Sequence, residues 1–159
     1  MPAFRDLRQF IEQVSALGEL RTIRAADADL EVGAITEVAA QAETVPMLLF
    51  EQIHGCAPEY RVLTHLLSSP ARENVVYGVP AELDDAQAMR VWKDRCRHVE
   101  PLAPRVVSDG PVLARVETGD EVDLTRLPFI RWHEGDGGRY LCATAAVTRD
   151  PDDGYINVG

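Results

Sequence analysis

The sequence WHEGDGGRYLCATAAVTRDPDDGYINVG, residues 132–159, contains the features that decide the fold of this chain. From 139 to 148 the residues suit the alternating faces of a strand. The turn sequence DPDDG follows at 150–154, where an Asp-Pro pair begins the turn and Gly154 can take the left-handed conformation that closes a hairpin loop. The pattern predicts a β-hairpin whose second strand starts at Tyr155.

The second strand of this hairpin carries the candidate site residues. Tyr155, Asn157 and Gly159 lie on one face of such a strand, and Ile156 and Val158 lie on the other. An Asn close to a hairpin is most often a turn or edge residue, and a Tyr there can simply pack against its neighbours. Spacing alone therefore assigns neither residue a binding role.

Upstream, the sequence predicts helices that alternate with strands. The first helix ends at Gly18, and its apolar face consists of Phe4, Leu7, Phe10, Ile11, Val14 and Leu17. A short strand is expected over 20–25. Asp29 is the expected N-cap of a second helix, and the face of that helix consists of Ile35, Val38, Ala39 and Ala42.

The next elements are short and have clear boundaries. Two apolar runs bounded by Pro and Gly predict strands over 47–53 and 60–67. Ser69 and the following Pro suit the start of a short helix that Gly78 ends. A third long helix is expected to open at Asp84 with a capping box, and its apolar side consists of Met89, Trp92, Cys96 and Val99.

Residues 101–104 mark a change in the sequence pattern. Beyond them Gly and Pro recur, helical periodicity is absent, and strand-like pieces such as 112–117 appear. We therefore predict an α/β N-terminal domain over 1–103, followed over 104–159 by the first strands of a β-rich domain that is incomplete in this chain.

Composition narrows the classes of partner. The 159 residues carry a formal net charge of −10, which disfavours binding to nucleic acid or to an anionic membrane surface. No apolar run approaches the roughly 20 residues of a membrane helix, and the first residues do not resemble a signal peptide, so we expect a cytoplasmic protein without a membrane span. The three cysteines are too far apart to indicate a metal or disulfide framework.

Other candidate motifs favour structural roles. The run GDGG at 135–138 fits no phosphate-binding pattern and predicts a tight loop. The pair His133-Glu134 lacks the second histidine of a zinc helix, and the aspartates of 150–153 do not match a calcium loop. The histidines are scattered and are expected to be structural or exposed: His54, His65, His98 and His133.

Five blocks of the chain, in order, resemble the N-terminal portion of UbiD-family decarboxylases, which depend on prenylated FMN. They are FRDLRQFIEQVSALGELRTI (4–23), DADLEVGAITEVAAQA (27–42), GDGGRY (135–140), TRDPDDG (148–154) and NVG (157–159). The resemblance implies that the β-rich part is the beginning of a split-barrel-like, FMN-binding domain. It also implies a non-oxidative decarboxylase (carboxy-lyase) that acts on an aromatic or α,β-unsaturated carboxylic acid.

The resemblance also assigns roles to residues. Asn157 is the implied ligand of a divalent metal, Mn²⁺ or Mg²⁺, at the cofactor phosphate, for which an amide oxygen is a suitable ligand. Tyr155 is the implied donor of a backbone carbonyl to a monovalent ion such as K⁺. The family's catalytic Arg and acidic residues are implied to lie beyond Gly159, so we expect no catalytic residue here and no turnover by this chain alone.

Three interpretations of such a chain stay open. In the first, the chain is a degenerate relative or works with the remainder of the decarboxylase or with a second subunit, and it is expected to belong to an oligomer. In the second, it is a non-catalytic assembly or regulatory subunit that docks onto a larger enzyme through an open β edge. In the third, it is a plain flavin- or anion-binding module, which would bind ordinary FMN without decarboxylation. None of them identifies the substrate acid.

Overall fold

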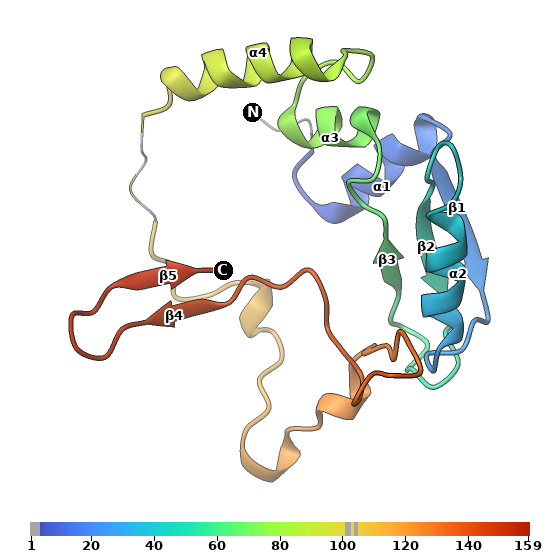
Figure 1. The fold of residues 1–159 in the computed structure, drawn as a ribbon. Coiled ribbons are helices and arrows are strands. Elements are labelled where there is room, and N and C mark those ends of the chain that lie inside the picture. The colour runs from blue at the N-terminus through green and yellow to red at the C-terminus, as the bar shows by residue number, and fades with distance from the viewer. Residues whose placement is uncertain (1–3, 101–102, 104) are drawn as a thin grey trace.

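The computed structural model describes residues 4–100, 103 and 105–159, and Figure 1 shows its fold. A three-stranded mixed sheet forms the centre of the N-terminal half. It consists of β1 (Leu20–Arg24), β2 (Met47–Glu51) and β3 (Val62–Thr64), with β2 in the middle. β1 pairs with β2 in parallel, and β2 pairs with β3 antiparallel. These strands confirm the ones expected from the sequence.

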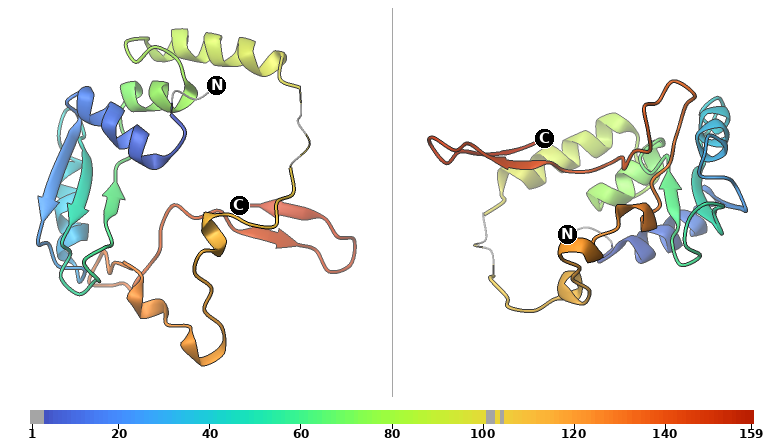
Figure 2. Two further views of the ribbon diagram at one scale, coloured as in Figure 1. Left: turned by 180° about the vertical axis from the view of Figure 1, so that it is seen from behind. Right: turned by 90° about the horizontal axis from the view of Figure 1, so that it is seen from below.

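Helices cover both faces of this sheet, as the two views of Figure 2 show. On one face α2 (Glu31–Ala39) contributes Val32 to a core that contains Leu48 and Phe50 of β2. On the other face α1 (Leu7–Ala16) and α3 (Pro70–Tyr77) form a second core from Phe10, Val14, Met47 and Val75. Because both faces are covered, the run MLLF of β2 is buried throughout.

Helix ends were predictable where a polar side chain caps them. Ser69 is the N-cap of α3, and Gly78 ends that helix in the left-handed conformation. α4 (Asp85–Arg97) begins with the expected capping box between Asp84 and Gln87. The predicted cap at Asp29 is wrong. Leu30 occupies that position, and the side chain of Asp29 is paired with Arg131 instead.

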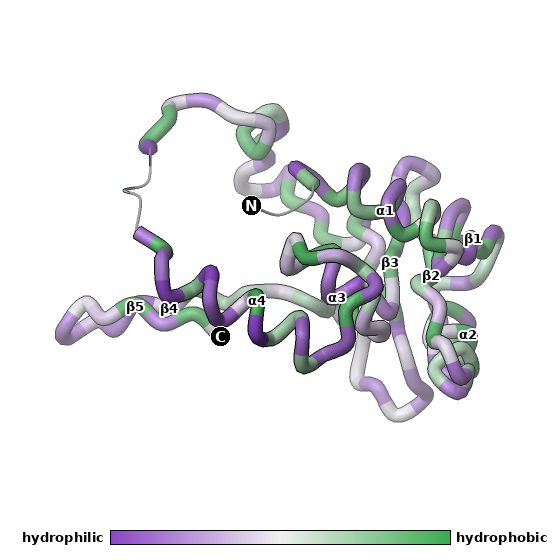
Figure 3. Tube along the Cα trace, turned by 90° about the horizontal axis from the view of Figure 1, so that it is seen from above, coloured by the Kyte–Doolittle hydropathy of each residue, from purple (hydrophilic) through white to green (hydrophobic). Residues whose placement is uncertain are grey.

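The expected apolar faces of α2 and α4 are only partly buried. In α2 the buried residues are Val32 and Gly33, whereas Val38 is 73% exposed. Ala42 lies beyond the end of that helix. In α4 only Ala88 is buried, and Met89 is 59% exposed. Both helices therefore present apolar side chains to the surface. Figure 3 colours the hydrophobic residues along the trace of each helix.

The second half of the chain contains fewer strands than predicted. The expected strand-like piece at 112–117 begins inside a 3-10 turn, Pro111–Leu113, and two more such turns follow at Gly119–Glu121 and Leu124–Arg126. The long strand expected over 139–148 is reduced to β4 (Val147–Arg149). A strand persists only where a neighbour can accept its hydrogen bonds, and β5 pairs only with 147–149.

The predicted hairpin is present between β4 and β5 (Ile156–Val158), and it extends away from the central sheet in Figures 1 and 2. The carboxylate of Asp150 accepts hydrogen bonds from the amides of Asp152 and Asp153, and Gly154 has a φ of 77°. Both strands are exposed along their whole length. The turn chemistry read from DPDDG is therefore confirmed.

The predicted domain boundary at 103/104 cannot be placed on an element, because residue 104 lies outside the described residues, and it stays a prediction. All three cysteines are free thiols: Cys56 is half-buried, whereas Cys96 and Cys142 are exposed. Within the described ranges, no helix is long and apolar enough to cross a membrane.

Candidate functional site

Asn157 lies in the middle of β5, directly opposite Thr148 of β4. Its main chain is held by the two-stranded ladder, whereas its exposed side chain makes no hydrogen bond to any described residue. The amide oxygen of Asn157 is therefore available as a ligand on a defined strand.

Tyr155 immediately precedes β5. Its carbonyl oxygen accepts a hydrogen bond from the amide of Asp150 at 2.8 Å, which closes the hairpin loop. A carbonyl oxygen has two lone pairs, so this bond leaves one acceptor position open. The Tyr155 side chain is 68% exposed, so it is not a core residue of the described chain.

The donor set on the hairpin fits one metal ligand, not a complete site. A hard cation such as Mg²⁺ takes several oxygen ligands. Among the described residues, no group of three or more His, Cys, Asp or Glu side chains comes together in a way that could hold a metal ion. The single amide oxygen of Asn157 does not by itself make a metal site.

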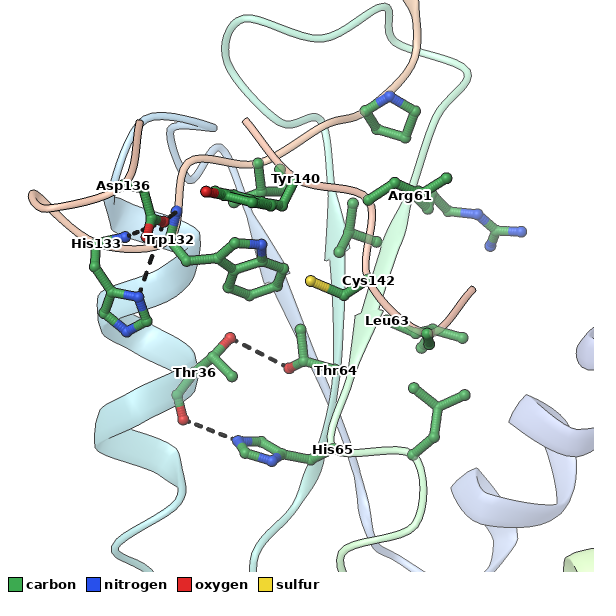
Figure 4. Close-up of a pocket in the computed structure, with 16 residues that line it drawn as sticks. Thr36, Arg61, Leu63, Thr64, His65, Trp132, His133, Asp136, Tyr140 and Cys142 are labelled. Atoms are coloured by element: carbon green, nitrogen blue, oxygen red, sulfur yellow. Dashed lines mark hydrogen bonds and ion pairs between the residues drawn. The ribbon is translucent and has the colours of Figure 1, made fainter. Parts of the chain in front are cut away.

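A separate cavity of about 670 Å³ lies between α2, β3 and the segment 128–143. Figure 4 shows its labelled residues: Thr36 from α2, Leu63 and Thr64 from β3, and Trp132, Tyr140 and Cys142 from the later segment. Neither Asn157 nor Tyr155 lines it. The structure thus brings together two parts of the chain that no sequence pattern connects.

Hydrogen bonds join these two parts directly. The amide of Leu30 donates to the carbonyl of Arg131 at 2.9 Å, and the amide of Arg131 donates to the carbonyl of Ala28 at 3.1 Å. The guanidinium of Arg131 also donates to the carboxylate of Asp29 at 3.1 Å. The segment around Arg131 therefore continues the N-terminal layer beside α2.

Gly33 allows the segment to approach α2 this closely. A Cβ placed on Gly33 would lie 2.1 Å from the carbonyl oxygen of Trp132, far inside van der Waals contact. Only glycine leaves room for the main chain of Trp132 at this position. A glycine within a helical pattern is a signal of close packing, and Gly33 is the residue that carries this signal in the sequence.

Asp136 fixes the backbone beyond Trp132. Its carboxylate accepts hydrogen bonds from the amides of Trp132 and His133, at 3.0 and 2.9 Å. This arrangement confirms the tight loop predicted for the run GDGG, with the Asp as its organising residue. The neighbouring His133 is exposed, as expected for the histidines.

His65 has a structural role at the opposite side of the cavity. Its Nε2 lies 2.9 Å from the carbonyl oxygen of Thr36, to which it donates, and its Nδ1 lies 3.3 Å from the hydroxyl of Ser68. Both ring nitrogens are therefore engaged, and the ring links the end of β3 to α2.

Two domain models match the chain. The 3-octaprenyl-4-hydroxybenzoate carboxy-lyase N-terminal domain (UbiD_N) matches residues 11–90, and the corresponding Rift-related domain (UbiD) matches residues 105–159.

Two curated relatives are decarboxylases. The chain is 35% identical to pyrrole-2-carboxylic acid decarboxylase of Pseudomonas aeruginosa, in a match covering 86% of this chain and 29% of the relative. It is 31% identical to phenolic acid decarboxylase of Streptomyces sp. (strain D7), over 99% of this chain and 34% of the relative. The chain thus spans about a third of the length of these proteins.

Solved structures give the same result. The chain superposes on Sedimentibacter hydroxybenzoicus vanillic acid decarboxylase (ShVdcCD), in its open form, with a TM-score of 0.81 and 27% identity, covering 99% of this chain and 33% of that one. It superposes on the UbiD-class enzyme HmfF from Pelotomaculum thermopropionicum, solved with prFMN, with a TM-score of 0.72 and 28% identity, covering 98% and 34%. The order of the elements, the hairpin and these matches together show that the chain belongs to the UbiD family.

Proposed function

We propose that this chain is the N-terminal part, or a subunit, of a UbiD-like carboxy-lyase that acts on an aromatic or α,β-unsaturated carboxylic acid through prenylated FMN. The observation that carries the proposal is the unpaired amide of Asn157 on the exposed strand β5, inside the region matched by the Rift-related domain. The decarboxylase relatives and the neighbour solved with prFMN support the same chemistry.

In this proposal the chain holds the cofactor and does not carry the proton-transfer groups. Asn157 supplies one oxygen ligand to a divalent metal, Mn²⁺ or Mg²⁺, at the cofactor phosphate. The open acceptor position on the Tyr155 carbonyl suits a monovalent cation such as K⁺. Prenylated FMN, when bound, supplies the electron sink that decarboxylation requires. The main-chain hydrogen bonds of the hairpin position the backbone of both residues.

The remaining metal ligands and the catalytic Arg and acidic residues belong, in this proposal, to the other two thirds of the enzyme or to a second subunit. We therefore expect the pure 159-residue chain, supplied with prenylated FMN, Mn²⁺ and K⁺, to release no carbon dioxide from pyrrole-2-carboxylate or phenolic acids. Measurable release would contradict the proposal.

The role of Asn157 is tested by metal retention, which does not depend on turnover. The chain is produced together with the remaining two thirds of the Pseudomonas aeruginosa relative, and the metal content of the purified complex is measured by mass spectrometry. Asn157→Ala is expected to lower the Mn²⁺ content by at least about tenfold. Thr148→Ala, on the opposing strand, is the matched control and should retain the metal; equal retention by both variants would remove Asn157 from the site.

A second candidate function is a non-catalytic assembly subunit. It is favoured by the open sheet edges, because β1 and β3 each have one edge without a strand partner among the described residues. A partner enzyme that retains its metal and full activity after removal of this chain would support this function over the first.

A further inference from the structure

The indole nitrogen of Trp132 has no acceptor. In the part of the chain that the structure describes, its Nε1 is the one buried side-chain nitrogen or oxygen without a hydrogen-bond partner. Trp132 lines the cavity between α2, β3 and the segment 128–143, as Figure 4 shows. A buried donor without an acceptor is unfavourable, and native structures rarely contain one. The indole Nε1 therefore needs an acceptor that the described residues do not supply.

Apolar side chains are also exposed on the surface around the cavity. Leu141 is 58% exposed and Tyr140 is 50% exposed at its border, while Leu63 and Leu66 line it half-buried. A small-molecule pocket usually encloses its ligand, whereas here apolar side chains continue from the cavity onto the open surface. Such continuity is typical of a contact with another polypeptide.

We propose that this cavity is the docking site for a polypeptide segment from the other two thirds of the UbiD-family enzyme. The segment inserts an apolar side chain and offers a main-chain carbonyl to Nε1 of Trp132. This inference rests on the proposed function, in which a complementary polypeptide completes the enzyme. We assign the docking segment to the rest of the enzyme for two reasons. This chain covers only 29% and 34% of the curated relatives. It nevertheless superposes on a longer decarboxylase with a TM-score of 0.81.

The Asp136 carboxylate beside Trp132 is not the missing acceptor. The carboxylate of Asp136 already accepts hydrogen bonds from the main-chain amides of Trp132 and His133. With these two bonds made, Asp136 leaves the indole Nε1 without a partner. A main-chain carbonyl oxygen is a neutral acceptor that a docking segment can offer at this atom. The half-buried leucines of the cavity favour apolar side chains in that segment.

The main chain that carries the indole has defined contacts. Gly33 leaves room for the main chain of Trp132 beside α2, and the Asp136 carboxylate accepts a hydrogen bond from the Trp132 amide. Main-chain atoms that already have partners need less ordering when a segment docks.

The test uses the remaining two thirds of the Pseudomonas aeruginosa relative, mixed with this chain and, in a second preparation, joined to it as one polypeptide. Thiol alkylation is followed at Cys142, which lines the cavity, and at Cys96 on α4, which does not. Mass spectrometry of the peptides resolves the two sites. We expect alkylation of Cys142 to slow by at least about tenfold in both preparations, relative to this chain alone.

Three substitutions test which side chains form the docking surface. Leu141→Arg is expected to weaken association by at least about tenfold, because it places a charge in the contact. Its matched control is Met89→Arg on α4, where the native side chain is 59% exposed, and which should change affinity by less than about twofold. Trp132→Phe keeps an aromatic ring but removes the donor, and it should weaken association by about three- to tenfold.

The outcomes separate the docking site from the proposed function of the chain. Unchanged alkylation of Cys142 in both preparations, or a loss of affinity for Met89→Arg but not for Leu141→Arg, overturns the docking site. Decarboxylation by a complex whose Cys142 stays reactive would leave the proposed function intact and reject the docking site. A protected Cys142 in a complex without turnover would support the docking site and reject the function.

Discussion

Gly33 of α2 lies against the main chain of Trp132 with no room for a Cβ between them. In most helices, replacing an interior glycine by alanine stabilises the helix by up to about 1 kcal/mol. Here a Cβ would lie 2.1 Å from the Trp132 carbonyl oxygen, so the two backbones must separate. The sign of the effect therefore reverses.

We expect Gly33→Ala to lower the free energy of unfolding by about 1–3 kcal/mol, measured by urea denaturation. Gly135→Ala is the matched control, because a Cβ there meets no atom within 4 Å. A neutral or stabilising Gly33→Ala would show that α2 and the segment at Trp132 separate freely.

Arg72 is the largest fully buried side chain of the described residues, and its charge is compensated by Glu19. Its guanidinium also donates to the carbonyls of Leu66 and Val45, and the hydroxyl of Ser69 donates to Glu19 at 2.5 Å. This cluster joins the loop before β1, the loop before β2 and the start of α3.

Removing Glu19 leaves a buried charge without its counter-ion. We expect Glu19→Ala to lower the free energy of unfolding by about 3 kcal/mol. Arg24→Ala removes a surface ion pair with Glu51, in which Arg24 is 67% exposed, and should cost less than about 1 kcal/mol. Urea denaturation of both variants checks the difference, and similar losses would show that the buried pair contributes no more than the exposed one.

The thiol of Cys56 gives the fold a pH dependence. Its partial burial raises the pKa, Asp27 raises it further, and Arg139 opposes them. A pKa raised by folding means that the stabilisation is complete below the unfolded-state pKa and is lost as pH rises through the folded-state pKa. We expect the stability of the wild type, relative to Cys56→Ala, to fall in alkaline solution. Parallel pH profiles for the two proteins would contradict this.

At the scale of elements, α4 is the least supported helix. Only Ala88 of its residues is buried, and Arg95 ties it to α3 by donating to the carbonyls of Tyr77 and Gly78. Its first turn depends on the capping box of Asp84 and Gln87.

We expect Asp84→Ala to destabilise α4 by about 1 kcal/mol without unfolding the sheet. Hydrogen exchange of the α4 amides should accelerate about fivefold, while the amides of β2 stay protected. Asp85→Ala, which removes an acidic residue that is not the cap, should have a smaller effect. Equal acceleration in α4 and β2 would show that the helix unfolds only with the rest.

The elements that were predictable from sequence are those with local determinants. Ser69, Gly78 and Asp84 set helix ends through their own chemistry, and the DPDDG loop folds through the carboxylate of Asp150. The N-cap at Asp29 was mispredicted because its side chain is taken by Arg131, 102 residues away. The strand expected over 139–148 needs a partner strand, which no local pattern can supply.

In the candidate site, too, only the part with local determinants was predictable from the sequence. Asn157 was placed on the correct strand from hairpin spacing, and its role as a ligand stays a prediction. The cavity at Trp132 was not predicted, because it forms where α2 and β3 meet a segment distant in sequence.

At the scale of the whole molecule, the described chain leaves many large apolar side chains exposed. The most exposed are Val106, Val112, Val38, Val147, Val99 and Tyr155. Together with the open edges of β1 and β3, these side chains favour association.

We expect the isolated chain to self-associate, with a sedimentation coefficient that rises with protein concentration. Addition of the remaining two thirds of the Pseudomonas aeruginosa relative should replace this behaviour by a single complex. A sharp monomer at all concentrations would contradict the expectation.

The pairing of Asp29 with Arg131 also constrains folding during synthesis. Its two side chains are 102 positions apart, and the neighbouring main-chain bonds span a similar separation. At a translation rate of roughly 5–20 residues per second, the first of these segments waits about 5–20 s on the ribosome for its partner. During that interval the side of α2 at Gly33, which later lies against the main chain of Trp132, is uncovered.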